Sequence, residues 1–521
     1  MGRQEWDYVV AGGGTAGCVL AARLTERPGQ TVLLLEAGPE YPSILRIPLV
    51  GMQQSATYSW KYFTAQQPEL GQRRLSFPFG KVIGGSSSTN AMMYYRGTRA
   101  SFDSWKQLGN DGWSFDDVLP YFRKSEHFEH GPSEYHGGEG PVHVSEPRHK
   151  APFSEAFIEA CLEQGWPRNL DFNGPDETGA GYFSVMQRRG RRSGSADAYL
   201  KDARGRPGLT VKTGVFVRRV ILDGGRALGI EFSNGKGEVE TAQAASEVIL
   251  SAGALNTPHL LLLSGIGPPE QLRSIGIEPR IHLAGVGENL RDHVRIPVLY
   301  ETSRRSPGHM RHWVPAALDY LVRRRGVMAS NCCESGAVLR SRPESPMPDL
   351  QFVTHFQTSL YPGAVDLQLC LLRSASRGRV MAVSADPNVP PAINPNYFSE
   401  RPDIELAIRG VRLARQIAAS PALRRFPLGP EILPGPELLT DGQIENYCRS
   451  VAETCYHPVG TCRMGKDSMA VVDAKLRVHG TERLRIVDAS VMPDIPNGNT
   501  CAAVLMIAER AADFLTSDRS G

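Results

Sequence analysis

Apolar positions along the chain form continuous runs and alternating stretches that predict strands, with helix-spaced stretches between them. Residues 7–11 and 31–36 are apolar runs, and a glycine-rich turn with a helical pattern lies between them. A continuous apolar run bounded by turn residues is typical of a buried strand, so a strand–helix–strand unit is expected here. Between 205 and 250, short alternating segments separated by hairpin turn signals predict an antiparallel meander. The predicted strands are 209–211, 217–222, 227–232 and 238–242, followed by a buried strand at 247–250 that runs into another glycine turn.

The later part of the chain predicts a second domain before the chain returns to the first. Residues 300–450 are rich in proline and arginine, and strands and a helix are expected within them. The last 40 residues contain one further strand pattern and one long helical pattern. The predicted strands are 349–354, 366–372 and 484–489, and the predicted helices are 404–419 and 500–515.

The glycine turn after the first predicted strand has the spacing of a nucleotide-binding turn. Gly12, Gly14 and Gly17 have the spacing GxGxxG, and Glu36 ends the second predicted strand. Gly12 permits a tight turn, Gly14 lets the backbone approach a pyrophosphate, and Gly17 lets helix and strand pack closely. The helix N-terminus presents N–H groups to phosphates, and Glu36 can accept hydrogen bonds from a ribose diol. We therefore predict an ADP-type dinucleotide site.

Composition and charge indicate a soluble globular enzyme. The chain has 521 residues, 41% of them apolar and 22% charged, and a net charge of +3. This near balance gives no support for nucleic-acid binding, and the basic run at 188–192 is interpreted as a solvated loop. Nine cysteines include no CxxC pair, so free thiols in a reducing compartment are expected.

The hydrophobic pattern predicts no membrane-spanning helix. No stretch approaches about eighteen consecutive apolar residues, and the first strand begins too early to leave room for a signal peptide. Residues 311–325 have apolar positions at helical spacing between arginines, a pattern that can contact a membrane surface. We interpret this segment as a helix that covers a pocket, and we expect a cytoplasmic protein.

Three further segments lie far apart along the chain and carry a specific resemblance. They are GKVIGGSSSTNAMMYYRG at 80–97, GALNTPHLLLLSGIG at 253–267 and YHPVGTCRMG at 456–465, with VDASVMP at 487–493 and PNGNT at 496–500. Together with the first glycine turn, these motifs resemble the glucose–methanol–choline (GMC) oxidoreductase family over residues 7 to about 515. The resemblance implies FAD rather than NAD as the cofactor.

Pattern and resemblance together predict an α/β fold class. We expect an FAD-binding Rossmann-like domain with an inserted antiparallel meander, and an α+β substrate-binding domain with an antiparallel sheet. A chain of this length exceeds one ordinary core, so more than one domain is expected. The predicted parts are 1–155, 201–300 and 451–521 for the FAD-binding domain, 156–200 for a connecting segment of the substrate domain, and 301–450 for the substrate domain proper.

The resemblance also implies which residues contact FAD. Val217 matches the position whose backbone meets adenine, and Asp488 matches an acid near the pyrophosphate and ribityl chain, with a helix or turn cap as its alternative role. An aliphatic residue is usual at position 89, and some choline oxidases have a histidine there that carries a covalent flavin. Thr89 cannot form that bond, so FAD is expected to be held non-covalently. The implied FAD contacts are Gly12, Gly14, Thr15, Ala16, Gly17, Glu36, Ala37, Gly84, Gly85, Ser86, Asn90, Ala91, Met92, Val217, Asp488, Ala489, Asn499 and Thr500.

Two residues are candidates for catalysis. Alcohol oxidation by a flavin requires loss of the hydroxyl proton and hydride transfer from carbon to flavin N5, and histidine suits the first step. By resemblance, His457 is the catalytic histidine, and Asn499 is the second catalytic residue that holds the substrate oxygen. His293 matches a family segment that we interpret as a structural turn. No metal site is expected, because the histidines at 127, 130, 136, 143 and 149 match no ligand spacing and are interpreted as surface loop residues.

The resulting prediction is an FAD-dependent enzyme that oxidises an alcohol, more often primary in this family, to an aldehyde or ketone. The reduced flavin is reoxidised by oxygen or by another acceptor. Alternatives left open are a flavin-containing hydroxynitrile lyase, a light-driven fatty-acid decarboxylase, which His457 disfavours, and a flavin-binding module without activity. Glu334 and Trp313 are conceivable members of a cage for a quaternary ammonium such as choline, but no motif identifies the substrate.

Overall fold

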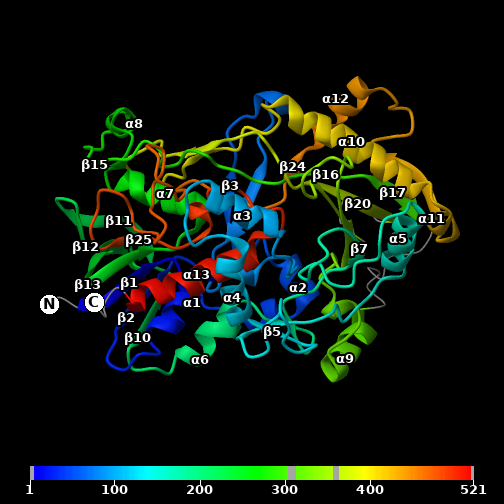
Figure 1. Cartoon of the computed structure of the whole chain (residues 1–521). Coiled ribbons are helices and arrows are strands. Elements are labelled where there is room, and N and C mark those ends of the chain that lie inside the picture. Colours follow the sequence, from blue (N-terminus) through cyan, green and yellow to red (C-terminus); the bar gives the residue numbers. More distant parts are fainter. Residues whose placement is uncertain (1–4, 303–312, 356–362, 518–521) are drawn as a thin grey trace.

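The computed structural model describes residues 5–302, 313–355 and 363–517 of the chain. Two large sheets organise it, one on each side of the view in Figure 1. The first and last segments of the chain lie together in the half that contains β1, β2 and α13, as expected for a chain that returns to its first domain. Each sheet has its own hydrophobic core.

The first sheet has seven strands. Its order is β10-β2-β1-β13-β12-β11, and β25 pairs with β13. The pairs β10–β2, β2–β1, β1–β13 and β13–β25 are parallel, whereas β13–β12 and β12–β11 are antiparallel. The predicted parallel sheet with an attached antiparallel meander is therefore confirmed. The strands are β1 (Glu5–Ala11), β2 (Val32–Glu36), β10 (Leu209–Thr213), β11 (Phe216–Asp223), β12 (Arg226–Ser233), β13 (Val239–Leu250) and β25 (Leu484–Ile486).

Two details of the predicted meander are wrong. The segment at 209–211 is part of β10, which pairs in parallel with β2 at the sheet edge instead of joining the hairpins. The segments at 238–242 and 247–250 form one strand, β13. Its first half pairs with β12 and its second half with β25, while β1 pairs along much of its length. An alternating pattern identifies a strand but does not identify the strand that pairs with it. The pairing of β1 with β13 shifts register between Trp6 and Tyr8, as at a β-bulge.

The second sheet is antiparallel and has eight strands. Its order is β23-β17-β20-β19-β18-β7, and β16 pairs with both β20 and β24. The predicted strands at 349–354 and 366–372 correspond to β19 and β20, which pair along six positions. The strands are β7 (Gly179–Tyr182), β16 (Val294–Ile296), β17 (Leu299–Thr302), β18 (Ser335–Leu339), β19 (Leu350–His355), β20 (Ala364–Leu371), β23 (Leu428–Leu433) and β24 (Glu453–Thr454). The domain boundaries placed from the sequence stay predictions.

Helices cover the two sheets. In the first half α13 packs against α1, and both bury apolar residues in the same core as β1 and β2. In the second half α10 contacts β20, and α5 contacts β7 and β18. The helices are α1 (Thr15–Leu24), α2 (Pro48–Gln53), α3 (Arg99–Gln107), α4 (Phe115–Ser125), α5 (Pro152–Glu163), α6 (Lys201–Ala203), α7 (Gly253–Leu263), α8 (Pro269–Ser274), α9 (Trp313–Arg323), α10 (Arg401–Ala418), α11 (Pro421–Arg425), α12 (Asp441–Val451) and α13 (Thr500–Ser517).

Helix α9 forms where the sequence predicts a helix, and its role as the cover of a pocket stays a prediction. Val314, Leu318, Leu321 and Val322 are exposed, and none of them lines a cavity among the described residues. Across the described ranges, no helix combines the length and the hydropathy that crossing a bilayer requires.

Candidate active site

Two adjoining cavities lie at the carboxyl ends of β1 and β13. The larger is about 480 Å³ and is lined by residues from both halves, including His457 and Asn499. The smaller is about 270 Å³ and contains Glu36 and Val217 in its wall. Gly14, Gly85 and Ser251 are among the residues that line both cavities. A long ligand can therefore extend from the end of β2 to His457.

The glycine turn between β1 and α1 has the geometry that its spacing predicts. Gly12 has φ +106°, in the region that favours glycine. A Cβ on Gly17 would lie 1.9 Å from the Gly12 oxygen, so only glycine lets helix and strand pack this closely. Beside Gly14 the nearest atom to such a Cβ would be 3.8 Å away, which leaves open space at the cavity wall and at the N-terminus of α1.

Glu36 ends β2 inside the smaller cavity. Its carboxylate accepts backbone hydrogen bonds from Gly13 at 2.8 Å and Gly38 at 2.7 Å. Burial raises the pKa of Glu36 to about 7, although these hydrogen bonds and Lys81 oppose the shift. The side chain is thus fixed in position, and its remaining lone pairs can accept from a ribose diol.

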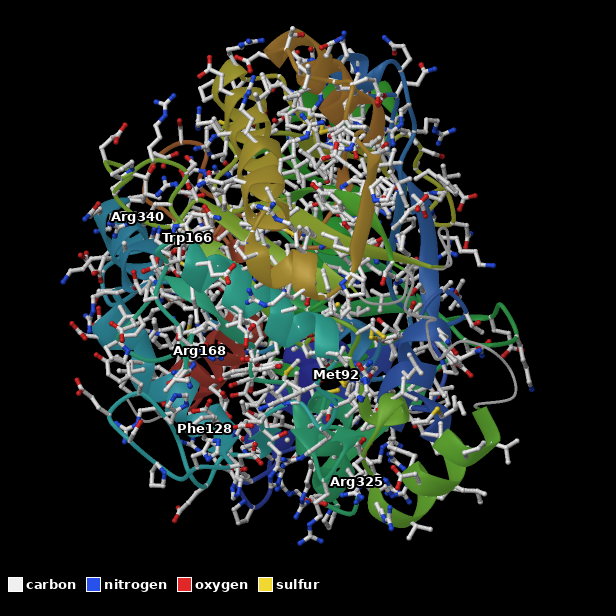
Figure 2. The ribbon with its side chains drawn as sticks, turned by 90° about the vertical axis from the view of Figure 1, so that its right-hand side faces the viewer. Met92, Phe128, Trp166, Arg168, Arg325 and Arg340 are labelled. Carbon is white, nitrogen blue, oxygen red and sulfur yellow. The ribbon has the colours of Figure 1, made fainter. Side chains whose placement is uncertain are left out.

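Most residues predicted to contact FAD line the two cavities. Gly17 and Gly84 do not, because Gly17 packs against the glycine turn and a Cβ on Gly84 would lie 2.2 Å from Ser88 Oγ. Met92, labelled in Figure 2, is buried near the middle of the molecule and lines the larger cavity. The predicted residues that line either cavity are Gly12, Gly14, Thr15, Ala16, Glu36, Ala37, Gly85, Ser86, Asn90, Ala91, Met92, Val217, Asp488, Ala489, Asn499 and Thr500.

Arg192 supports this wall from behind. Its Nη1 donates to Asn90 Oδ1 at 2.7 Å and to the Ser87 oxygen at 3.2 Å. The side chain is buried, and burial lowers the pKa of Arg192 to about 10. The interpretation of 188–192 as a solvated loop is therefore wrong for Arg192, while Arg188, Arg189 and Arg191 are exposed.

Asp488 takes a capping role and also lines the larger cavity. It accepts from Gly253 N at 2.8 Å and Thr257 Oγ1 at 2.6 Å, at the first turn of α7. Its other oxygen accepts from the backbone and hydroxyl of Ser490. Asp488 thereby joins the turn after β25 to α7, and its contact with FAD stays a prediction.

Unpartnered polar atoms in the walls of the two cavities indicate, independently of the motifs, that the cavities fit FAD. Ser251 follows β13 in the wall that both cavities share, and its Oγ is buried without a hydrogen-bond partner among the described residues. His259 Nε2 in the smaller cavity and Asn499 Oδ1 in the larger one are also buried and unpartnered there. Buried polar atoms are normally satisfied, so unpartnered atoms along one elongated space are expected of a polar cofactor site.

His457 and Asn499 meet at the wall of the larger cavity. His457 lies three residues after the end of β24, and Asn499 immediately precedes α13. His457 Nε2 and Asn499 Nδ2 are 3.1 Å apart. Asn499 is held by a hydrogen bond from its backbone N–H to the Tyr95 oxygen. Segments 42 residues apart thus place an imidazole and an amide beside the same space.

Two residues that the sequence analysis did not assign to the site hold His457 in place. His293 Nδ1 lies 3.0 Å from His457 Nδ1, with the two rings nearly perpendicular. The backbone N–H of His457 donates to Asp292 Oδ1 at 2.7 Å. The other Asp292 oxygen accepts from the hydroxyl groups of Thr454 and Tyr397. The interpretation of the segment that contains His293 as a structural turn did not anticipate this direct contact with His457.

Burial controls the charge of this cluster. It lowers the pKa of His457 to about 4 and moves the pKa of His293 well below its usual value, further lowered by His457 and Arg291. Burial also raises the pKa of Asp292 to about 6, while its hydrogen-bond donors oppose the shift. Both imidazoles are consequently neutral at pH 7.

Two charged side chains, Arg295 and Asp488, are among the residues that line the larger cavity. Arg295 on β16 lines it and pairs with Glu453, while its Nη1 donates to Gln368 at 3.1 Å. Glu334 does not line it, because its carboxylate is buried against Ala151 N and Ser154. The side chain of Trp313 lies outside the described residues.

Comparisons with known proteins agree with this geometry. Sequence models of the GMC oxidoreductase family match residues 6–295 and 374–508. The oxygen-dependent choline dehydrogenase of Klebsiella pneumoniae is 41% identical, covering 98% of this chain and 96% of its own. An alcohol dehydrogenase [acceptor] of Pseudomonas putida is 39% identical, covering 98% and 95%. A structure of Aspergillus oryzae formate oxidase, concerned with FAD modification, has a TM-score of 0.92 at 28% identity, covering 99% of each chain.

Matches of this extent establish both the family and its chemistry. The family models together span well over half of the chain, and the relatives are alcohol-oxidising enzymes aligned over nearly its full length. The cavities described above supply the space and the polar groups that FAD needs. The chain belongs to the GMC oxidoreductase family and is an FAD-dependent alcohol oxidoreductase.

Proposed function

We propose that His457 accepts the hydroxyl proton of the alcohol and that Asn499 holds the alcohol oxygen beside it. The observation that carries this proposal is the 3.1 Å contact between His457 Nε2 and Asn499 Nδ2 at the cavity wall. Bound FAD supplies the acceptor for the hydride that leaves the alcohol carbon. The residues of the chain therefore need to orient the alcohol, remove its proton and exclude water.

The hydrogen bonds around His457 favour one arrangement of protons. With the Asn499 amide oriented as in the structure, its N–H donates to His457 Nε2, so that nitrogen carries a lone pair. The His457 proton then resides on Nδ1 and donates to His293 Nδ1. The neutral imidazole accepts the hydroxyl proton at Nε2 once the entering alcohol takes the place of the Asn499 N–H at that lone pair.

Asp292 and His293 act as positioning residues in this proposal. Asp292 fixes the backbone at His457, and His293 fixes the orientation and tautomer of the ring. Asn499 has a second amide hydrogen, and its Oδ1 is buried without a partner among the described residues. The amide can therefore both donate to the alkoxide that forms and accept from the alcohol that enters.

We further propose that the substrate is a primary alcohol without a positive charge. Choline, the compound named in the Klebsiella relative, carries a quaternary ammonium that requires an anionic or aromatic cage. Tyr456 is one of several aromatic residues in the cavity wall, and Arg295 already lies over its ring, with its Cζ 5.8 Å from the centroid. Glu453 is already paired with Arg295, and Asp488, the carboxylate in the described wall of this cavity, already accepts four hydrogen bonds, so a cation there finds no free counter-charge among the described residues.

An anaerobic titration tests this function. The visible flavin band is followed while choline or its uncharged isostere 3,3-dimethylbutan-1-ol is added, together with other primary alcohols. Bleaching by an uncharged alcohol is expected, with choline at least about fivefold less effective in kcat/KM, because the described cavity wall offers no free carboxylate to a quaternary ammonium. Preference for choline would overturn the substrate proposal, and a flavin that no alcohol bleaches would overturn the proposed reaction.

The same titration separates the electron acceptors. If oxygen is the electron acceptor, air admitted to the reduced protein reoxidises the flavin rapidly. Slow reoxidation in air would show that another compound accepts the electrons. An Arg295→Gln variant should narrow the difference between choline and its isostere. His355→Gln, at another polar residue of the cavity wall, serves as the matched control and should leave that difference unchanged.

A further inference from the structure

Helix α9 presents a continuous apolar stripe to solvent. Val314, Leu318, Leu321 and Val322 are between 58% and 80% exposed. Their spacing of i, i+4, i+7 and i+8 places them on one face of the helix. Of the thirteen large hydrophobic residues exposed within the described ranges, these four are concentrated in nine consecutive positions. Scattered exposed apolar residues are normal on protein surfaces, but a contiguous stripe indicates an interaction site.

The opposite face of α9 anchors it to the protein. Tyr320 is buried in a small cluster with Leu49 and Met328, and Ala316 packs against this cluster. The Tyr320 hydroxyl donates to the Gly190 oxygen at 3.0 Å. The exposure of the stripe is therefore a consequence of how the helix is seated, and Figures 1 and 2 show α9 at the edge of the molecule.

Exposed arginines flank the stripe. Arg323 and Arg325 lie at the C-terminal end of α9, where Asp319 is the nearby acid, at 3.2 Å and 4.0 Å. The hydrogen bond to Gly190 brings the basic loop against the helix, and Arg188, Arg189 and Arg191 in that loop are exposed. Five exposed guanidinium groups thus accompany one acidic side chain.

We propose that α9 and the loop at 188–191, here called the basic apolar face, bind the surface of a membrane that contains anionic phospholipids. An amphipathic helix with aliphatic residues on one face and arginines beside it lies in the interfacial plane, with its apolar side chains among the acyl chains. Arginines at its margin attract anionic headgroups. α9 has 11 residues, which suits a helix that lies on the membrane and is too short to cross it.

Charge distinguishes a membrane from other partners for this face. Two copies that paired through the stripe would bring ten arginines together against two aspartates, which opposes self-association. A nucleic acid would satisfy the arginines but leave the aliphatic stripe in water. Anionic lipid satisfies both parts at once.

The basic apolar face is structurally connected to the substrate cavity. Helix α2 packs Leu49 beneath α9, while its Met52 lines the larger cavity. A membrane bound at α9 would therefore lie across a single short helix from the cavity wall.

Vesicle sedimentation of the FAD-loaded full chain tests the proposal. We expect binding to phosphatidylcholine vesicles that contain about 30% phosphatidylglycerol, weak binding to pure phosphatidylcholine, and release at about 0.5 M salt. Replacing Leu318 and Leu321 together with glutamate should lower the partition coefficient more than about tenfold. Arg323→Gln and Arg325→Gln should each lower it about fivefold, equivalent to ~1 kcal/mol per basic residue.

A matched control separates this face from general stickiness. Leu170 and Leu439 are comparably exposed elsewhere, and replacing both with glutamate should leave vesicle binding unchanged. Alcohol oxidation in solution verifies that every variant is folded and loaded with FAD. Equal binding of the Leu318/Leu321 variant and the wild type would overturn the proposal, as would failure of the wild type to bind anionic vesicles. Concentration-dependent dimerisation abolished by the same variant, without vesicle binding, would instead assign the face to a second copy.

Discussion

The burial of His457 predicts an unusual response of the enzyme to acid. The pKa of this imidazole is lowered to about 4 by burial, compared with 6.5 for an unperturbed histidine. If His457 is the base, its neutral form must be present for the reaction, and lowering the pH removes that form. The perturbation is a change from pH 7.5 to pH 5.5 with an alcohol that does not itself titrate.

The size of the effect follows from the two pKa values. At pH 5.5, a histidine with a pKa of about 4 is roughly 97% neutral, whereas one with a pKa of 6.5 is roughly 9% neutral. The structure therefore predicts that kcat/KM at pH 5.5 stays close to its value at pH 7.5. An unperturbed histidine would reduce it about tenfold.

The assay is the pH dependence of kcat/KM, which reports the ionisation of the free enzyme. As a control, enzyme incubated at each pH is returned to pH 7.5 and assayed again. Full recovery of activity shows that the loss at low pH is titration and not acid denaturation. Asp292 has a pKa raised by burial to about 6 and lies against the His457 backbone. The Asp292→Asn variant separates its contribution, because a loss of activity that Asp292 causes disappears in that variant.

An acid limb with a midpoint near 6.5 that persists in Asp292→Asn would contradict a buried, neutral base at His457. It would mean that His457 is hydrated in the working enzyme, or that another group is the base. A midpoint near 4 to 5 supports a buried, neutral His457.

Three further outcomes test other parts of the account. Asn499→Ala should lower kcat about 10²- to 10³-fold while the visible flavin spectrum is retained, and an unchanged kcat would remove Asn499 from the proposed machinery. Gly17→Ala should abolish recovery of yellow protein, because its Cβ would lie 1.9 Å from a backbone oxygen; Gly442→Ala in α12, where the space is open, should fold normally and serves as control. Glu126→Gln should lower the free energy of unfolding by about 3–5 kcal/mol, because it leaves the buried Arg96 guanidinium without its carboxylate, and a calorimetric loss below about 1 kcal/mol would contradict this.

Much of the fold follows from local sequence, whereas the pairing of strands does not. The β1–α1–β2 unit is predictable because the glycine turn, the apolar runs and Glu36 lie within one short stretch. The edge position of β10 is not, because its alternation is equally compatible with a hairpin. The continuity of β13 also escapes prediction, since its two halves have different neighbours and therefore different patterns.

Some residues of the site can likewise be predicted from local sequence, and others cannot. Residues inside long motifs, such as His457 and Asn499, are recognisable in the sequence, and the structure brings them into contact. His293 and His457 are 164 positions apart in the sequence, and the local sequence around either residue does not predict their contact. Arg192 and His136 are buried, although their neighbours in the sequence suggest surface loops. Arg192 bonds to Asn90, 102 positions away, and His136 bonds to Glu126 and Asp171, 10 and 35 positions away.

The rate of flavin reduction in a His457→Gln variant shows whether His457 accepts the hydroxyl proton. Glutamine keeps a side chain that can bond to Asn499 but cannot accept the hydroxyl proton, and an unchanged visible spectrum shows that FAD is bound. Mixed anaerobically with a saturating alcohol, the variant should be reduced about 10²- to 10⁴-fold more slowly than the wild type. Reduction within about threefold of the wild-type rate would contradict the assignment of His457 as the base.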